Sequence, residues 1–416
     1  MENHHCWKGQ KKLKYGYTTG TCAAVAAEEA TLRLLLGKHR ENVEAVLKDN
    51  ICFEIPVREA SGQPADREDA WEGAWYGCSV VKDSGDDPDV TNGSEVCAYV
   101  RILPGLCEEE QARQERKFFF DGRRRENFSP FTLLLSGGEG VGRVTGSGLE
   151  QEPGYAAINV WPRRQIFAAV AEVCRQADFH GTLEIRIVVP EGRRLAEKTF
   201  NPRLGITDGI SILGTTGVLE PMSERALVDT IALEIRAALA GKGRILLVTP
   251  GNYGQAYVQE YLKLSLTDAV KCSNYIGEAL DLAVNLGAEG FLLAGDIGKL
   301  VKLAAGIFQT HSRQADGRME ILGVHAAMAG ADARIVCRIM DCVTTAQALG
   351  ILKECGLLEP VMDSVLQRIG EHLKKRAGAM RTGVCLFAAD YGMLGCAGEA
   401  MSLAEEYRKQ SGQTDE

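Results

Sequence analysis

The pattern of hydrophobic and polar positions changes its character near residue 223. Before that point, short stretches in which apolar and polar residues alternate predict strands, and two stretches of helical periodicity interrupt them. The expected strands are residues 43–47, 51–55, 75–81, 96–103, 131–135 and 183–189, and the expected helices are 22–36 and 163–176. The turn residues Asp49 and Asn50 make the first two strands a hairpin. The pattern predicts an α+β domain over residues 1–222 with a mainly antiparallel or mixed sheet.

Beyond residue 223, short apolar strands alternate with helices. The expected strands are residues 244–248, 290–294 and 383–388, and the expected helices are 223–239, 274–286 and 299–308. This alternation predicts a parallel sheet with right-handed crossovers, and therefore an α/β domain over residues 223–416. The loops 251–254 and 295–298 follow two of these strands. They should lie at the carboxyl edge of the sheet, where open α/β sheets bind ligands.

Composition limits the classes of function. Hydrophobic residues make up 45% of the chain and charged residues 25%, as in an ordinary globular protein with an ample core. The net charge of −9 argues against broad nucleic-acid binding. The 13 cysteines include no Cys-x-x-Cys pair, so we expect reduced thiols in a cytoplasmic protein. The 7 histidines lack zinc-site spacing, and neither a membrane span nor a signal peptide is indicated.

Two threonine-rich segments are candidate ligand loops. Thr18, Thr19 and Thr21 stand where an alanine-rich helix begins, and the free N–H groups and positive dipole end of a helix attract anions. The simpler alternative is a threonine N-cap. Thr215 and Thr216 lie between glycines in the segment 201–223, which is either a flexible crossing between domains or a loop that faces the substrate.

Two further segments combine acids with glycine. The segment 82–93, KDSGDDPDVTNG, holds four aspartates, and crowded carboxylates can raise one pKa and create a general base. The alternative is a loop whose aspartates accept hydrogen bonds from their own backbone. The segment 136–148, SGGEGVGRVTGSG, could cradle a phosphate with its N–H groups, but it lacks the P-loop lysine, and a glycine-rich hairpin fits equally well. Glu139 is its one acid.

A basic cluster follows the second strand of the α/β region. Lys299 and Lys302 lie one helical turn apart, and His311 and Arg313 follow them closely. Such a cluster suits an acidic ligand. A solvated helix face and a structural histidine are the alternatives.

Taken together, these segments resemble the CbiD family, the cobalt-precorrin-5B carbon-1 methyltransferases of anaerobic cobalamin biosynthesis. The resemblance is carried, in chain order over roughly residues 14 to 325, by GYTTGTCAAVAA, KDSGDDPDVTNG, GGEGVGRVT, KTFNPRLGI, GISILGTTGVLEPMS, TPGNYG, SNYIGEALDLA and GKLVKLAAGIFQTHSR. It implies an α+β N-terminal domain and a Rossmann-like C-terminal domain. It also implies transfer of a methyl group from S-adenosylmethionine to ring carbon 1 of cobalt-precorrin-5B, giving cobalt-precorrin-6A. Cobalt then enters only as part of the substrate, and no metal is bound by the protein itself.

The implied chemistry assigns roles to the candidate residues. Because the nucleophile is a ring carbon and the sulfonium is already activated, the enzyme needs orientation and a base rather than a nucleophilic side chain. Base candidates are Asp86, Asp87 and Glu139. Candidates for the methyl donor are Thr249, Gly251, Asn252, Tyr253, Gly254 and Asp296. Candidates for the carboxylate-rich substrate are Thr18, Thr19, Thr21, Arg203, Thr215, Thr216, Lys299, Lys302, His311 and Arg313.

The chain departs from the family pattern at two positions. Asp296 and Asn92 stand where relatives commonly have histidine, so a proton shuttle by either histidine is not available here. Two other classes of function remain as alternatives, a nucleotide-dependent kinase or ligase and a non-catalytic corrinoid carrier. The sequence does not fix the oligomeric state, and transient contact with neighbouring pathway enzymes is compatible with it.

Overall fold

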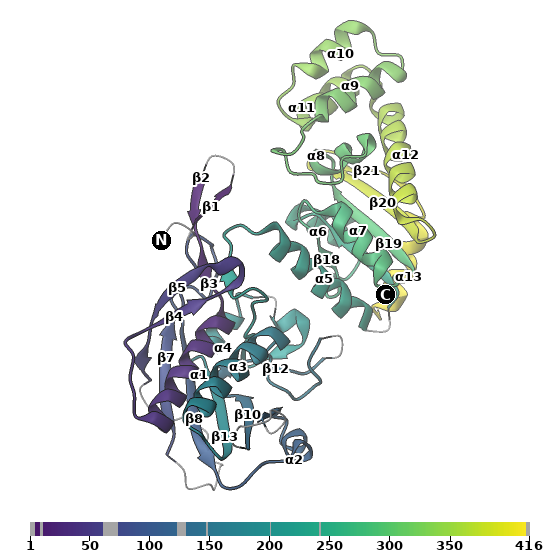
Figure 1. Ribbon diagram of the computed structural model, residues 1–416. Coiled ribbons are helices and arrows are strands. Elements are labelled where there is room, and N and C mark those ends of the chain that lie inside the picture. The colour runs from purple at the N-terminus through teal and green to yellow at the C-terminus, as the bar shows by residue number, and fades with distance from the viewer. Residues whose placement is uncertain are drawn as a thin grey trace. The chain divides into compact units, whose positions relative to one another are not determined.

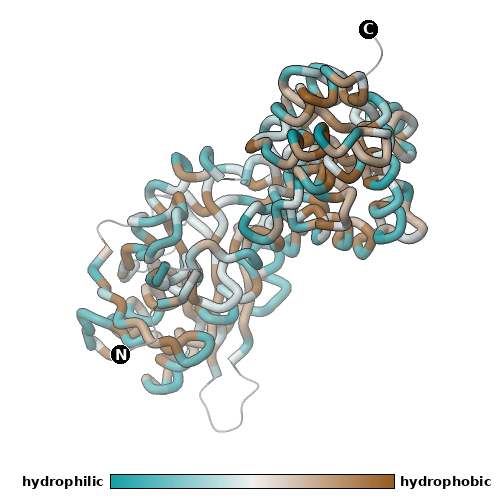
Figure 2. The backbone as a smooth tube through the Cα atoms, turned by 90° about the horizontal axis from the view of Figure 1, so that it is seen from above, coloured by the Kyte–Doolittle hydropathy of each residue, from teal (hydrophilic) through white to brown (hydrophobic). Residues whose placement is uncertain are grey.

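The chain divides into two compact units, Met1–Ser223 and Glu224–Glu416. The computed structural model describes residues 5–8, 11–60, 74–122, 130–146, 149–199, 201–240 and 243–412 (Figure 1). Hydrophobic and hydrophilic stretches alternate along the backbone of both units (Figure 2). The two largest hydrophobic cores lie in different units, so each unit has a core of its own.

Unit 1 is built on a six-stranded sheet with the order β6-β7-β8-β13-β10-β9. These strands are β6 (Arg58–Glu59), β7 (Tyr76–Val81), β8 (Glu95–Leu103), β13 (Gly181–Val188), β10 (Phe131–Gly137) and β9 (Phe118–Asp121). β10 and β13 pair in parallel, and the other neighbours pair antiparallel. The sheet is therefore mixed, as the sequence pattern predicts.

Two helices, α1 (Thr19–Leu36) and α3 (Val160–Gln176), pack side by side against this sheet (Figure 1). The first half of α1 consists of small residues that are almost all buried, which lets the helix approach its neighbours closely. α1 ends at Gly37, whose left-handed φ of 63° lets its N–H bond back to the carbonyl of Arg33. The shorter helices are α2 (Glu109–Gln114), α4 (Gly192–Ala196) and the 3₁₀ turns η1 (Lys48–Asn50) and η3 (Asn201–Leu204).

Short strands complete unit 1 in two-stranded pairs. The antiparallel pairs are β1 (His5–Lys8) with β2 (Lys11–Lys14), β4 (Asn42–Val46) with β5 (Cys52–Pro56), β3 (Gly16–Tyr17) with β16 (Val218–Leu219), and β12 (Arg143–Val144) with β14 (Ile206–Thr207). The parallel pair is β11 (Gly140–Val141) with β15 (Gly209–Ile210). The predicted hairpin is confirmed as β4 and β5.

Unit 2 is built on a five-stranded sheet with the order β18-β17-β19-β20-β21. These strands are β18 (Val270–Lys271), β17 (Ile245–Thr249), β19 (Gly290–Asp296), β20 (Arg381–Ala388) and β21 (Gly392–Gly398). The first four are parallel, as the alternation of strands and helices predicts, and β21 is antiparallel. The sequence pattern missed β21, because its glycines lack the β-branched and aromatic character of a strand.

The helices of unit 2 cover its sheet and extend beyond it. They are α5 (Glu224–Ala240), α6 (Asn252–Tyr257), the π-helical turn η4 (Val258–Leu262), α7 (Ile276–Asn285), α8 (Ile297–Leu300), the 3₁₀ turn η5 (Val301–Ala305), α9 (Arg318–Met328), α10 (Ala333–Met340), α11 (Thr345–Glu354), α12 (Leu358–Ala377) and α13 (Ala400–Gln410). The prediction of one helix over 299–308 is wrong. The α-helix ends at Leu300, and the tighter 3₁₀ turn stops at Gly306 with a left-handed φ of 74°.

Candidate functional site

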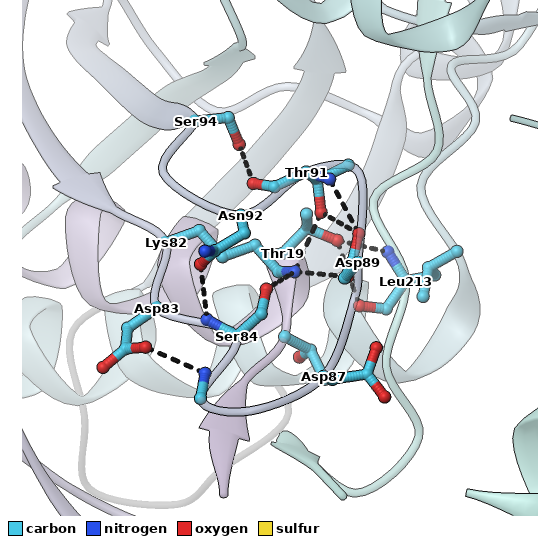
Figure 3. A network of polar contacts seen from close by, with 12 residues as sticks. Thr19, Lys82, Asp83, Ser84, Asp87, Asp89, Thr91, Asn92, Ser94 and Leu213 are labelled. Carbon is cyan, nitrogen blue, oxygen red and sulfur yellow. Dashed lines mark hydrogen bonds and ion pairs between the residues drawn. The ribbon is translucent and has the colours of Figure 1, made fainter. Parts of the chain in front are cut away.

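Three segments that are distant in the sequence meet at the start of α1 in unit 1. The N–H of Thr18 donates to the carbonyl of Gly217 (3.0 Å), and the N–H of Gly20 donates to the carbonyl of Leu213 (3.1 Å). Thr19 bonds Leu213 through its hydroxyl, which accepts from the Leu213 N–H at 3.0 Å. Figure 3 shows Thr19 and Leu213 together beside the aspartate-rich segment. The segment 213–217 is thus packed onto the helix start and is not a loose crossing.

In this packing, the polar groups at the start of α1 make hydrogen bonds within the protein. Thr18 caps the helix by accepting from the N–H of Thr21 (3.2 Å), and the Thr21 hydroxyl donates to the carbonyl of Gly217 (2.9 Å). Thr18, Thr19 and Thr21 are only 4%, 3% and 2% exposed. The geometry therefore supports the N-cap interpretation and argues against an anion at this end. Gly214 has a φ of +133°, and a Cβ there would overlap the Thr18 side chain, so the contact requires glycine.

The other predicted residues of this segment differ from each other in exposure. Thr215 is exposed, and its side chain can meet a ligand. Thr216 is half-buried and donates its hydroxyl proton to the carbonyl of Val218 (2.9 Å). Arg203 has its backbone in η3, and its side chain lies outside the described part of the chain.

The aspartate-rich segment is organised around one buried lysine, as Figure 3 shows. The ammonium group of Lys82, whose side chain is 1% exposed, donates to Asp89 Oδ2 (2.5 Å), Ser84 Oγ (2.8 Å) and Thr91 Oγ1 (2.8 Å). Asp89 Oδ1 in turn accepts from the N–H and the hydroxyl of Thr91. Asn92, one of the two departures from the family pattern, accepts from the N–H of Ser84 (2.9 Å) and so supports the same loop.

Ion pairs divide the four aspartates into two kinds. Burial raises the pKa of Asp89, but the Lys82 charge and the hydrogen bonds outweigh it and hold this pKa below its ordinary value. The pKa of Asp83 is also low, because the hydrogen bond from Lys14 and the N–H of Gly85 outweigh the burial of the carboxyl group. Crowding therefore raises the pKa of neither Asp83 nor Asp89. Both accept hydrogen bonds from the backbone of their own loop, as the alternative interpretation of this segment predicts.

Asp86 and Asp87 are placed differently from the paired aspartates. Asp86 Oδ2 accepts from the N–H of Lys14 (2.6 Å), and Asp87 Oδ2 accepts from the N–H of Met222 (2.9 Å). Asp86 is exposed and Asp87 is half-buried. Each carboxylate is thus oriented through one oxygen by a backbone amide and has a second oxygen that could accept a proton.

The glycines that follow β10 lie close against neighbouring backbone. The N–H groups of Gly138 and Gly142 donate to the carbonyls of Ile187 and Ile210, each at 2.8 Å. A Cβ on Gly140 would overlap the backbone of Val189. The amides of Gly138 and Gly142 thus serve the fold, which argues against a phosphate cradle. The hairpin alternative is wrong as well, because the strands of this segment, β11 and β12, pair with β15 and β14 and not with each other. Glu139, in the middle of this segment, is exposed.

In unit 2, the predicted donor residues lie at the carboxyl edge of the parallel strands. Thr249 ends β17, and its hydroxyl oxygen is fully buried with no hydrogen-bond partner among the described residues. Gly254 in α6 lies against it, since a Cβ on Gly254 would be 3.4 Å from the Thr249 Cβ and 2.9 Å from the carbonyl of Ala294. Gly251 has open space around it, and Asn252 and Tyr253 are exposed, Tyr253 by 77%.

Three charged groups complete this edge: Asp296 and Lys271 end the strands β19 and β18, and Lys299 lies in α8, directly after β19. Asp296 caps α8 by accepting from the N–H of Gly298 (2.8 Å), and burial raises the pKa of its carboxyl group. Lys299 donates to the carbonyl of Pro250 (3.1 Å), and burial lowers the pKa of its ammonium group. Lys271 donates to Asn252 Oδ1 (2.5 Å). Sequence reasoning missed Lys271, because the two-residue strand β18 gives no readable period.

The basic cluster after Lys299 is only partly available to a ligand. Lys302 is 2% exposed, and its ammonium group donates to the carbonyls of Thr310 (3.0 Å) and Ala315 (2.9 Å). Its burial argues both against direct contact with a substrate and against a solvated helix face. Lys302 instead fixes the loop that carries His311 and Arg313, which are exposed. His311 Nδ1 accepts from the N–H of Arg313 (3.1 Å), so in the neutral ring Nε2 is the nitrogen that carries the proton.

Within the described residues, no helix has the length and apolar character that crossing a membrane requires. The same residues contain no group of three or more His, Cys, Asp or Glu side chains that could hold a metal ion.

Comparison with known proteins places the chain in a family. The CbiD family matches residues 6–221, and the description "CbiD, C-terminal domain" matches residues 309–398. A protein of Ruminiclostridium cellulolyticum named cobalt-precorrin-5B C(1)-methyltransferase is 42% identical over 370 residues, which are 89% of this chain and 87% of the relative. A protein of the same name from Alkaliphilus metalliredigens is 37% identical over 401 residues, 96% of each chain.

A solved structure is also similar. It is the crystal structure of the cobalamin biosynthesis protein cbiD from Archaeoglobus fulgidus, with 25% identity and a TM-score of 0.37 over 76% of this chain and 88% of that one. The family match covers more than half of the chain, and the relatives align over most of their length. The chain therefore belongs to the CbiD family.

Proposed function

We propose that this protein transfers a methyl group from S-adenosylmethionine to carbon 1 of cobalt-precorrin-5B in cobalamin biosynthesis. The observation that carries the proposal is the 42% identity, over most of both chains, to a relative named for this reaction. The product is cobalt-precorrin-6A, and cobalt belongs to the substrate. The free cysteines of the chain favour a reducing compartment, the cytoplasm.

The methyl donor is assigned to unit 2, which we interpret as a Rossmann-like domain. Two features of the carboxyl edge fit a nucleoside. The buried hydroxyl of Thr249 has no hydrogen-bond partner among the described residues, and the Asp296 carboxylate at the strand end can accept from ribose hydroxyls. Gly251 leaves room for close approach of a ligand to the backbone. When bound, the donor supplies an activated methyl group on a sulfonium, so the protein needs no nucleophile of its own.

The remaining tasks are binding and proton removal. The substrate carries several carboxylates, and the exposed Arg313 and the half-buried Lys299 can pair with them. Lys302 acts on this contact through the loop that it holds. Asp86 and Asp87 are the favoured bases for a ring proton, because each has one oxygen fixed by a backbone amide and one that can accept. Glu139 is the weaker candidate.

The proposal is tested by turnover under anaerobic conditions. Purified protein, labelled S-adenosylmethionine and cobalt-precorrin-5B are mixed, and the corrinoid is analysed by mass spectrometry and NMR. Gain of one labelled methyl group at carbon 1 is the expected result. Tight corrinoid binding without methyl transfer or donor binding would instead support a carrier. Protection against heat by Mg-ATP but not by the donor would support the kinase or ligase alternative.

The base is tested by Asp86→Asn and Asp87→Asn, with Asp83→Asn as the matched control. Loss of the base should lower kcat about 10²–10⁴-fold while donor affinity is retained. Asp83 is paired with Lys14 at the surface, so its variant should keep most of the activity. Unchanged rates in Asp86→Asn, Asp87→Asn and the double variant would remove both residues from the mechanism.

A further inference from the structure

Two cysteines face each other across the hairpin at the edge of the unit 2 sheet. Cys385 on β20 and Cys396 on β21 are direct partners in the antiparallel register. Their Sγ atoms lie 2.9 Å apart, and both residues are free thiols. Neither residue belongs to the carboxyl edge where the methyl donor is proposed to bind.

The backbone at this pair suits a disulfide bond. Directly opposite residues of an antiparallel pair have Cα atoms about 4.5–5.5 Å apart, which falls within the range of about 4.4–6.8 Å found for disulfides. The register shift in this hairpin begins only after Leu386, so Cys385 and Cys396 sit in a regular part of the ladder. The two sulfurs can therefore approach bonding distance by a small change of side-chain torsions.

The two thiols differ in access. Cys385 is fully buried in a hydrophobic cluster with Leu247, Ala294 and Phe387, whereas Cys396 is half-buried on the edge strand. The hydrogen bond between the thiols lowers the pKa of Cys396, and the same bond together with burial raises the pKa of Cys385. Cys396 is thus the thiol that a dissolved oxidant can reach, and Cys385 lies buried next to it.

We propose that Cys385 and Cys396 are a redox modification site that forms a reversible disulfide by exchange with a low-molecular-weight disulfide such as glutathione disulfide. The Cys396 thiolate attacks one glutathione sulfur, forms a mixed disulfide and releases one glutathione thiolate. The Cys385 sulfur then attacks Cys396 Sγ while its proton passes to the departing glutathione sulfur, which forms the internal bond and releases the second glutathione as a thiol. Two protein thiols are oxidised, and one glutathione disulfide is reduced to two thiols.

The bond would tie the edge strand to its neighbour near the donor-binding edge. β20 is parallel to β19, and its register places Phe387 opposite Asp296, just before the turn between β20 and β21. The turn therefore lies close to the carboxyl edge of the sheet. The proposal itself rests on the thiol geometry and is independent of the proposed methyl transfer.

The test uses the full chain equilibrated with glutathione and glutathione disulfide at graded ratios. Samples are quenched with acid, unfolded, and blocked with N-ethylmaleimide before trypsin digestion. Cys385 and Cys396 share one tryptic peptide, residues 382–408, because no lysine or arginine separates them. The expected result is a peptide that carries no N-ethylmaleimide and has lost two hydrogens. A second cleavage before Asp390 should leave its two halves joined until dithiothreitol is added.

Variants separate the roles of the two thiols. Cys385→Ala should accumulate a glutathione mixed disulfide at Cys396, whereas Cys396→Ala should leave Cys385 as a thiol. The exposed Cys337 reports that the oxidant is active, because it should form its own mixed disulfide. The proposal is overturned if the wild-type peptide keeps two alkylated cysteines at ratios that modify Cys337, or if Cys396 is found joined to any other cysteine.

Discussion

Replacing Lys82 by methionine should lower the free energy of unfolding of unit 1 more than removal of any other single charge in the aspartate-rich segment. The methionine side chain keeps most of the volume and removes the ammonium group. That group is buried and donates to three partners, Asp89, Ser84 and Thr91. After the change, the Asp89 carboxylate remains in the loop without its counter-charge, and this uncompensated charge is the main source of the loss.

The structure sets the size of the effect. Breaking a buried ion pair by removing one partner costs about 3–5 kcal/mol. The Asp89 side chain is 24% exposed and keeps two hydrogen bonds from Thr91, so we expect the lower end of that range, about 3 kcal/mol. For a unit of this size each kcal/mol shifts Tm by about 2–4 °C, which gives a fall of about 6–12 °C.

Tryptophan fluorescence during urea unfolding measures this loss in unit 1 alone. All 4 tryptophans of the chain lie in unit 1, so the unfolding of unit 2 is silent in this signal. Lys14→Met is the matched control. Lys14 pairs with Asp83 at the surface, with side chains 50% and 45% exposed, and its loss should change the free energy of unfolding by less than about 1 kcal/mol.

A double variant tests the cause. In Lys82→Met with Asp89→Asn, no unpaired charge is left, so the combined loss should be smaller than the sum of the single losses by about 1 kcal/mol or more. Strictly additive losses, or a loss below about 1 kcal/mol for Lys82→Met, would refute the assignment of Lys82 as the centre of this loop.

Three further outcomes are expected. Thr249→Val should weaken S-adenosylmethionine binding about threefold to tenfold in calorimetry. The stability of the free protein should not fall, because the lost hydroxyl has no partner within the described chain. Unchanged affinity would exclude Thr249 from the donor site. Gly140→Ala should cost unit 1 at least about 3 kcal/mol in urea unfolding, because its φ is +70° and the new Cβ overlaps backbone, whereas Gly146→Ala, with its nearest atom 3.8 Å away, should cost far less. The pKa values of Asp83 and Asp89 are lower in the folded than in the unfolded protein. The stability of unit 1 should therefore be level above about pH 5 and fall below about pH 4, because these carboxylates take up protons in the unfolded chain first. A level stability profile down to about pH 3 would contradict these ion pairs.

The sequence alone determined the local elements and the family. Alternation with period two located the hairpin of β4 and β5 and four strands of the large sheet of unit 1, β7, β8, β10 and β13. The change of pattern near residue 223 indicated the parallel strands β17, β19 and β20 of unit 2. These features depend on neighbouring residues, whose spacing is written in the chain. The sequence pattern did not predict β21, because its glycines show neither strand alternation nor strand propensity. It also did not predict the 3₁₀ turn η5, because the change from α-helix to 3₁₀ turn depends on tertiary packing.

Only the tertiary structure decided which polar groups remain available for chemistry. Thr19 appears in the sequence as part of an open helix start, yet it bonds Leu213, which is 194 residues away. Lys302 resembles a substrate-binding cation but is buried beneath its own loop. Cys385 and Cys396 form a pair only because a strand that the sequence pattern missed places them opposite each other. A polar side chain is free or used according to its partners in space, and those partners come from positions that no local pattern connects.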